Sequence, residues 1–194
     1  MSHPGRRFSR KYRGMLSYPL GGGSELRFFE ERHAADLFAL VDKNRARLRQ
    51  WLPWVDGSTE PAHTAAFIRG QLAAFAEGRG AAYGIWVDGA IAGSIGYHDM
   101  EPASRRVAIG YWIDAAHEGR GIMTRAVRAL VAHAFGELGM KRVEIRVAPD
   151  NARSRAIPER LGFREEGTLR QYMWLYDHCI DEVVYGLLAN EWKG

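Results

Sequence analysis

The sequence has little cysteine and no long apolar run. Its single cysteine, Cys179, has no partner for a disulfide within the chain, so nothing requires an oxidising compartment. No stretch approaches the roughly 18 apolar residues of a membrane span. The charged N-terminus also lacks the apolar segment of a secretory signal. Together these absences predict a cytoplasmic protein that does not associate with membranes.

Disorder and low complexity are excluded by what the chain does contain. Hydrophobic residues make up 46% of the 194 residues and charged residues 26%, which is the balance of a globular protein. The 22 glycines and 7 prolines follow no period, so a fibrous chain is excluded as well. This length fits one domain.

The basic residues are unevenly distributed. Five of the 27 lysines and arginines lie within residues 1–13, which contain no acidic residue, and the other 22 nearly balance the 23 acidic residues. We therefore expect a basic, flexible N-terminal arm over residues 1–22 and a nearly neutral folded domain over residues 23–194. Basic and aromatic residues alternate in the arm, as in some RNA-binding segments, although a plain tail has the same composition.

Hydrophobic periodicity predicts one domain of the mixed α/β (α+β) class. Asp88-Gly89 between two apolar runs indicates a tight hairpin and thus antiparallel strands. A strand, a long helix and another strand surround Gly121, which indicates a parallel pair joined by a crossover. We expect strands near residues 26–29, 83–87, 90–97, 106–113, 143–147, 163–175 and 179–188, and helices near 37–48, 60–77, 123–138 and 153–161.

Two glycines, Gly119 and Gly121, stand where a predicted strand turns into the long helix. The first turn of a helix has unpaired N–H groups, and glycines allow a phosphate to approach them closely. Plain turns of this kind also occur without a ligand. The segment is not the phosphate loop of nucleotide triphosphatases, and it lacks the third glycine of a dinucleotide-binding loop.

The segment from Asn151 to Phe163 directly follows the next strand. With it, the sequence resembles the GNAT superfamily of acetyl-CoA-dependent N-acetyltransferases along residues 25–190. Trp51-Leu52-Pro53-Trp54 and Gly121-Ile122-Met123-Thr124 look most like the RimJ/RimL-type branch, which acetylates protein N-termini and other amines. The resemblance implies a mostly antiparallel sheet with helices on both faces, its central parallel pair splayed at the cofactor site. The implied acetyl-CoA-binding residues are Trp112, Ile113, Glu118, Gly119, Arg120, Gly121, Ile122, Met123, Thr124, Asn151, Arg153 and Ser154.

The sequence departs from this family at three positions. Glu118 stands where the general pattern has Gln or Arg, and Met123 stands where it has Gly or Ala. Pro158 occupies a position where many relatives have a tyrosine, thought to protonate the departing CoA thiolate. Because proline fits best in the first turn of a helix, we expect this helix to begin near Ser154. Ser154 is our candidate for a contact with the sulfur or with the CoA chain.

The acceptor amine must lose a proton before it attacks a thioester. His98, Asp99 and Glu101, at the end of one predicted strand, are candidates to receive that proton, although each is also typical of a solvated turn. Of these, His98 and Glu101 are the predicted catalytic residues, together with Ser154. Four aromatic residues are candidates to line the acceptor pocket, namely Trp51, Trp54, Tyr97 and Tyr111. No histidine spacing or second cysteine indicates a metal site.

We therefore expect an enzyme that moves the acetyl group of acetyl-CoA to a primary amine, first of all the α-amine of a protein N-terminus. A small amine such as a polyamine, an amino sugar or an antibiotic is the alternative acceptor. A non-catalytic module that binds RNA or the ribosome through the basic arm is a third reading, in which nucleic acid is the partner. The resemblance also allows a homodimer.

Overall fold

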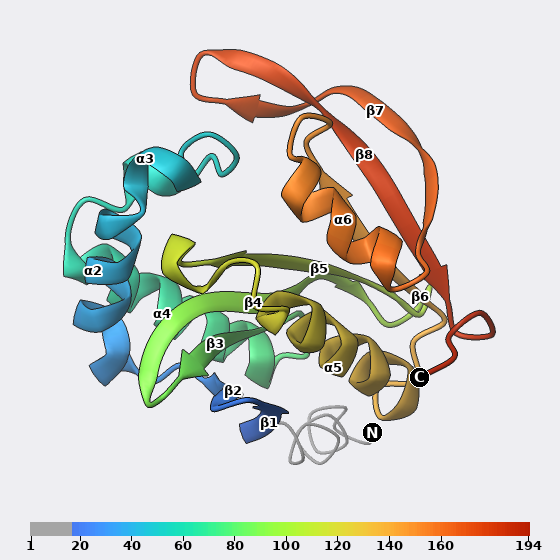
Figure 1. The fold of residues 1–194 in the computed structure, drawn as a ribbon, viewed down its shortest axis with the longest axis horizontal. Coiled ribbons are helices and arrows are strands. Elements are labelled where there is room, and N and C mark those ends of the chain that lie inside the picture. Colours follow the sequence, from blue (N-terminus) through green and yellow to red (C-terminus); the bar gives the residue numbers. More distant parts are fainter. Residues whose placement is uncertain (1–16) are drawn as a thin grey trace, which may run out of the picture.

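The computed structural model describes residues 17–194, which form one eight-stranded mixed sheet with helices on both faces (Figure 1). The strand order is β1-β2-β3-β4-β5-β6-β8-β7, and every neighbouring pair is antiparallel except β5 and β6. This confirms the predicted fold class. The strands are β1 (Ser17–Gly21), β2 (Ser24–Phe28), β3 (Ala81–Val87), β4 (Ala90–Glu101), β5 (Arg106–Ile113), β6 (Arg142–Val147), β7 (Arg164–Leu175) and β8 (His178–Leu188).

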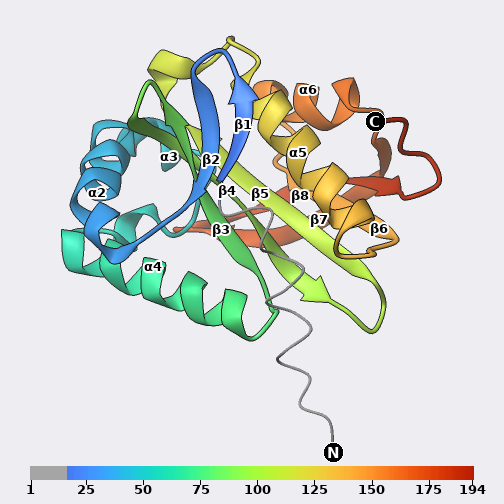
Figure 2. The same ribbon diagram turned by 90° about the horizontal axis from the view of Figure 1, so that it is seen from below.

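Helices cover both faces of the sheet (Figure 2). One face packs against α5 and α6, and its buried residues include Tyr83, Ile109 and Ile145. Helices α2 and α4 pack on the other face, around Phe29 and Ile68. The helical segments are η2 (Glu31–His33), α2 (Ala34–Lys43), α3 (Arg45–Leu48), η3 (Val55–Gly57), α4 (Pro61–Ala76), η4 (Ala115–His117), α5 (Ile122–Gly136) and α6 (Ala152–Arg160).

Local sequence explains the elements nearest the site. Asp88 and Gly89 both have positive φ, 49° and 84°, which is the conformation of a two-residue hairpin turn between β3 and β4. The apolar stripe predicted for the long helix is the buried face of α5, where Ala126, Val127 and Leu130 are fully buried. Both predictions are confirmed.

The N-terminal boundary differs from the expected one. Ser17–Gly21, expected within the flexible arm, forms β1 and pairs with β2 across the glycine turn. The folded domain therefore begins before residue 23. Residues 1–16, which hold the basic part of the predicted arm, lie outside the described residues.

The parallel pair at the centre of the sheet separates along its length. Arg106–Ala108 of β5 pair with Arg142–Glu144 of β6. Beyond them, β5 continues beside β4 to Ile113, while β6 continues beside β8 to Val147. At about 3.3 Å per residue, the stretch of β5 with no strand on its β6 side is roughly 17 Å long. This opening is the splay of the central parallel pair that the family resemblance implied, and it includes residues 111–113.

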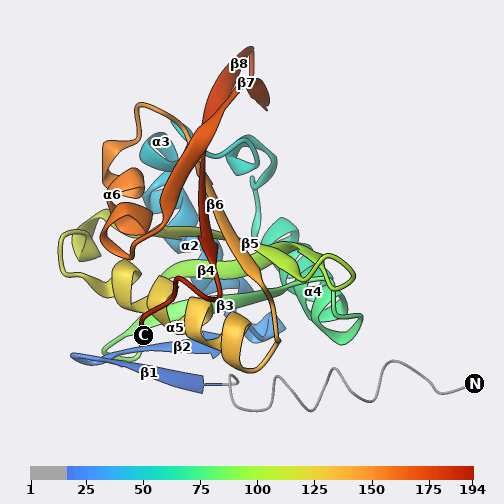
Figure 3. The same ribbon diagram turned by 90° about the vertical axis from the view of Figure 1, so that its right-hand side faces the viewer.

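The β7–β8 hairpin extends beyond the sheet (Figure 3), and its turn reaches the segment that follows α3. There the Tyr176 hydroxyl donates to the Leu52 carbonyl oxygen at 2.6 Å. The Arg49 guanidinium lies over the Tyr176 ring, 3.9 Å from its centroid. The hairpin is thus joined to the segment after α3. Within residues 17–194, no helix is long and apolar enough to cross a bilayer.

Candidate active site

Beyond Ala108, the backbone of β5 turns hydrogen-bonding groups that no neighbouring strand pairs toward the opening beside it. Asp114 N–H donates to Ala92 O at 2.7 Å, so Asp114 faces β4. In an antiparallel pair, alternate residues direct their N–H and C=O to opposite sides. Tyr111 and Ile113 therefore turn their backbone groups toward the opening, and the Arg47 guanidinium accordingly donates to Ile113 O. Among the described residues, no strand pairs with β5 at Tyr111 on this side, so its N–H can donate to a ligand.

The start of α5 provides the second group of donors. Gly121 caps this helix with φ of 70°, and no side chain caps the first turn. Gly119 also has a positive φ, 72°, and a Cβ placed there would meet no atom within 4 Å. The N–H groups of residues 119–124 thus surround a cradle of the kind that binds phosphate oxygens. Arg120 and Arg125 add positive charge where an open pocket of about 440 Å³ separates this turn from Gly21 and Gly22.

An ion-pair bridge crosses the opening at Glu118. One carboxylate oxygen of Glu118 accepts from Arg47 Nη1 at 2.5 Å, and the other accepts from Arg153 Nη1 on α6. Arg153 is an exposed side chain and Arg47 is half-buried. The residue that departs from the family pattern therefore joins α3, the glycine turn and α6.

Asp114 fixes the loop before the glycine turn to the end of α2. Its carboxylate, 2% exposed, accepts from Lys43 Nζ and Asn44 Nδ2, each at 2.9 Å. Burial opposes ionisation of this carboxyl, but these two hydrogen bonds, together with the positive charge of Lys43 and the Ala116 N–H, outweigh it and lower the pKa of Asp114. Asn44 Oδ1 in turn accepts from Ala115 N–H at 3.1 Å. Sequence reasoning missed this network, because its members are 70 or more residues apart.

Ser154 lies in the first turn of α6, opposite β5 across the opening. Asn151 caps this helix by accepting from Ser154 N–H at 3.1 Å. Tyr111 on β5 reaches Ser154, since its hydroxyl lies 3.1 Å from Ser154 O and 3.3 Å from Ser154 Oγ. The helix begins at Ala152, so Pro158 stands inside it and not in its first turn, contrary to our expectation. The Asn151 cap sets the start of the helix, and the proline is tolerated.

The other face of the sheet gathers part of the predicted acceptor pocket. Strand alternation turns the Trp112 side chain to this face, where it packs against residues of α2 and α3. Trp54, 41% exposed, lies beside it with ring centroids 6.4 Å apart. Trp51, three residues before Trp54, is half-buried in the same segment. Tyr97 is a core residue instead: it points toward α5 and donates to Leu130 O at 2.5 Å.

The structure separates the two predicted bases. His98 is exposed on the same face as Trp112, and a Cβ at Gly110 would lie 3.3 Å from its ring. Glu101 instead pairs with Arg106 at 2.5 Å near the β4–β5 turn, six residues along β5 from Trp112, or roughly 20 Å. Glu101 is thus remote from the opening, and we withdraw it as a base.

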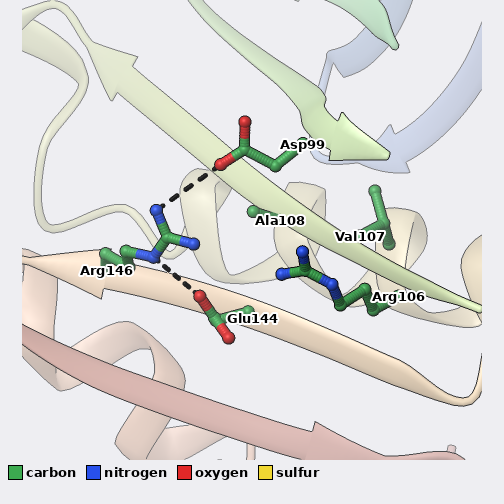
Figure 4. A pocket seen from close by; sticks show the side chains of 6 residues that line it. All are labelled: Asp99, Arg106, Val107, Ala108, Glu144 and Arg146. Atoms are coloured by element: carbon green, nitrogen blue, oxygen red, sulfur yellow. Dashed lines mark hydrogen bonds and ion pairs between the residues drawn. The ribbon is translucent and has the colours of Figure 1, made fainter. Parts of the chain in front are cut away.

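A bulge in β4 is the reason for this separation. Pairing with β5 shifts between His98 and Glu101, where Asp99 has a φ of 48°. The Asp99 carboxylate consequently points across Ala108 to Arg146 Nη1, 3.5 Å away on β6 (Figure 4). Arg146 also binds Glu144 at 2.7 Å, so a charged cluster marks the point where β5 and β6 diverge.

Sequence reasoning also missed the residues that the β7–β8 hairpin contributes. Tyr172 and Trp174 are 53% and 61% exposed, and Arg146 Nη1 donates to the Tyr172 hydroxyl at 3.1 Å. On β8, burial raises the pKa of Glu182, a shift that nearby Arg146 opposes. In the sequence, only the presence of aromatic residues pointed to Tyr172 and Trp174. The contact between Tyr172 and Arg146 depends on the length of the hairpin, which no local pattern encodes.

A splayed parallel pair, a glycine-capped helix start with free N–H groups and a polar second helix across the opening define a site for a phosphate-bearing, extended ligand. The nucleotide and pantetheine portions of acetyl-CoA match this arrangement in charge and shape. These features define an acyltransferase that takes its acyl group from coenzyme A.

The comparisons with known proteins agree. Residues 25–164 match the acetyltransferase (GNAT) domain family. A putative ribosomal N-acetyltransferase of Bacillus subtilis, YdaF, is 37% identical over 170 residues, 87% of this chain and 93% of the relative. The ribosomal-protein-serine acetyltransferase of Escherichia coli is 30% identical over 166 residues, 86% of this chain and 93% of that protein.

Solved structures give the same result. RimL, described as a ribosomal L7/L12 α-N-protein acetyltransferase in complex with coenzyme A, superposes with a TM-score of 0.86 at 30% identity, over 90% of this chain and 99% of that one. The microcin C7 self-immunity acetyltransferase MccE, in complex with acetyl-CoA and AMP, gives 0.83 at 25% identity, over 87% of this chain and 94% of that one. The chain belongs to the GNAT acetyltransferase family, and its co-substrate is acetyl-CoA.

Proposed function

We propose that this enzyme acetylates the α-amine of a protein N-terminus. The observation that carries the proposal is the match to two ribosomal-protein acetyltransferases along nearly their whole length. An extended peptide also suits the acceptor face, where Trp54 lies beside Trp112 and the exposed Tyr172 contacts Arg146 of the charged cluster. A polypeptide offers backbone and side chains to such a surface, whereas a small amine has few atoms to contact it.

Different residues at the opening bind the cofactor and stabilise the reacting group. Acetyl-CoA supplies an acetyl group activated as a thioester. The Tyr111 N–H, directed into the opening by strand alternation, is placed to stabilise negative charge that develops on the acetyl oxygen. The N–H groups at the start of α5 hold the pyrophosphate, so a nearly neutral domain needs no large basic patch.

His98 is our candidate for the residue that receives the amine proton. It lies on the acceptor face beside Gly110, and its Nδ1 is 3.3 Å from Asp99 Oδ2. A carboxylate beside one ring nitrogen favours a tautomer in which the other nitrogen accepts a proton. The solvent-exposed ring also allows the proton to pass on to water.

Acceptor identity is tested by comparing initial rates for three substrates at pH 7. These are a peptide with a free α-amine, the same peptide with a blocked N-terminus and one lysine, and a polyamine. The α-amine has a pKa near 7.7–8.0 and lysine near 10.4, so at pH 7 the neutral, reactive fraction is about 200- to 400-fold larger for the α-amine. We expect kcat/KM to be highest for the free N-terminus by roughly that factor or more. A higher value for the polyamine would favour the small-amine alternative.

A further inference from the structure

Pro158 leaves a gap in the hydrogen bonding of α6. In a regular helix the N–H of residue 158 donates to the carbonyl oxygen of Ser154, four residues earlier. Proline has no N–H, and this one lies inside the helix. The Ser154 carbonyl therefore lacks its helical partner at the point where α6 faces the opening of the sheet.

Tyr111 fills this gap from another element. Its hydroxyl donates to Ser154 O at 3.1 Å, and the same hydroxyl is 3.3 Å from Ser154 Oγ. The phenol extends from β5 three residues beyond Ala108, the last residue of β5 paired with β6. The family position that usually bears a tyrosine is Pro158 here, yet a phenol still reaches the first turn of α6, supplied by the facing strand.

We propose that Tyr111 is a positioning residue that holds the Ser154 hydroxyl toward the sulfur of coenzyme A. The proposal rests on the proposed acetyl transfer. In the structure, Ser154 Oγ donates to the Tyr111 hydroxyl. Hydroxyl hydrogens rotate, so when Ser154 turns its O–H to the sulfur, the direction of this bond can reverse and the Tyr111 O–H can donate to Ser154 Oγ. Two hydroxyls in series polarise each other and make Ser154 the better donor.

The bonds and protons balance without any further reactant. The amine lone pair forms the C–N bond, and the C–S bond breaks with its electron pair left on sulfur. The amine proton leaves through the acceptor side to water. The sulfur accepts a hydrogen bond from Ser154 and takes up a proton through this hydroxyl, which solvent restores.

Tyr111 keeps its own proton throughout. Burial raises the pKa of the Tyr111 phenol, an effect that the hydrogen bond from Ser154 only partly opposes. Releasing its proton there would leave a buried anion, so Tyr111 acts as a neutral donor and orients Ser154. Ser154 is the group that touches the sulfur.

The thiol pKa of bound coenzyme A tests the proposal without turnover. It is read from thiolate absorbance as pH is raised, with the wild type and with Tyr111→Phe, Ser154→Ala and the double variant. A hydrogen bond from Ser154 favours the thiolate, so each single variant is expected to raise the thiol pKa by about 0.5–1 unit. The double variant is expected to show no more than the Ser154→Ala shift.

Tyr185→Phe is the matched control. Tyr185 is a buried tyrosine whose hydroxyl also binds α6: it accepts from Arg155 Nε and donates to Glu159, each at 2.8 Å. Within residues 17–194, no hydrogen bond joins this hydroxyl to Ser154. Removing its hydroxyl disturbs the same helix to a similar degree. We expect this variant to keep the wild-type thiol pKa, which separates positioning of Ser154 from support of the helix.

Steady-state kinetics provide the second readout. We expect Tyr111→Phe to lower kcat about tenfold with the KM for acetyl-CoA nearly unchanged, and the double variant to match Ser154→Ala. Two results would overturn the inference while acetyl transfer stands. One is that the effects of Tyr111→Phe and Ser154→Ala add independently in both readouts, and the other is that Tyr111→Phe equals the wild type. Absence of acetyl transfer by the wild-type enzyme would remove the proposed function itself.

Discussion

A Gly121→Asp variant is expected to bind acetyl-CoA about 100-fold more weakly, a loss of ~2.7 kcal/mol. Gly121 has a φ of 70° at the start of α5, and its missing side chain leaves the first-turn N–H groups open to a phosphate. An aspartate there brings bulk and negative charge to the same place, and its Cβ would lie 3.3 Å from Arg125 Nη1. Isothermal titration of the variant with acetyl-CoA measures the effect.

The matched control for this variant is Gly139→Asp. Gly139 follows α5 at its other end, has a nearly equal φ of 68°, and a Cβ there would meet nothing within 4 Å. Both variants carry a left-handed backbone at the substituted position and the same added charge, and they lie at opposite ends of a helix that is about 22 Å long. Gly139→Asp is expected to keep wild-type affinity. Equal weakening in both variants would mean that strain or net charge, and not a phosphate cradle, explains the loss.

Replacing Asp114 by alanine is expected to lower the free energy of unfolding by about 2–3 kcal/mol. The carboxylate is nearly fully buried, and its removal leaves the Asn44 amide, itself buried, without that acceptor. Asn44 also holds Ala115 N–H, so the loop that leads to the glycine turn loosens. Urea unfolding measures the change.

Asp56→Ala is the control, because Asp56 binds Arg49 at 2.9 Å in an exposed pair worth no more than about 1 kcal/mol.

The pH dependence of the free energy of unfolding gives a second check. The pKa of Asp114 is lowered in the folded protein, so its contribution is complete above its unfolded value near 4 and is lost as pH falls through the lower folded value. Asp114→Asn is expected to lose less stability than the wild type in that acid range. An unchanged acid profile in this variant would contradict the role assigned to the carboxylate.

Short-range sequence signals predicted the cofactor half of the site. The buried stripe of α5, the Asp88-Gly89 hairpin and the two glycines before α5 all depend on neighbours within a few residues. Such patterns survive folding because backbone conformation and local packing decide them. They placed Gly119, Gly121 and Ser154 on elements that face the same opening.

The acceptor half depends on contacts that no local pattern encodes. The bulge at Asp99 directs that side chain toward β6. Residues 17–21, expected in the arm, form β1. Tyr176 meets Leu52 124 residues earlier in the chain, and Tyr97 turned out to be core because the pleat directs it to α5. Register and hairpin length decide these contacts, and a one-residue shift reverses the side-chain direction.

The most direct test is a titration of isotope-labelled protein with acetyl-CoA, followed by the amide resonances. We predict that the largest changes fall on the N–H groups of residues 119–124 and of Tyr111, which face the phosphates and the acetyl carbonyl. Acetyl-CoA that leaves these amides unmoved, or that binds only elsewhere on the chain, would contradict the assignment of the site.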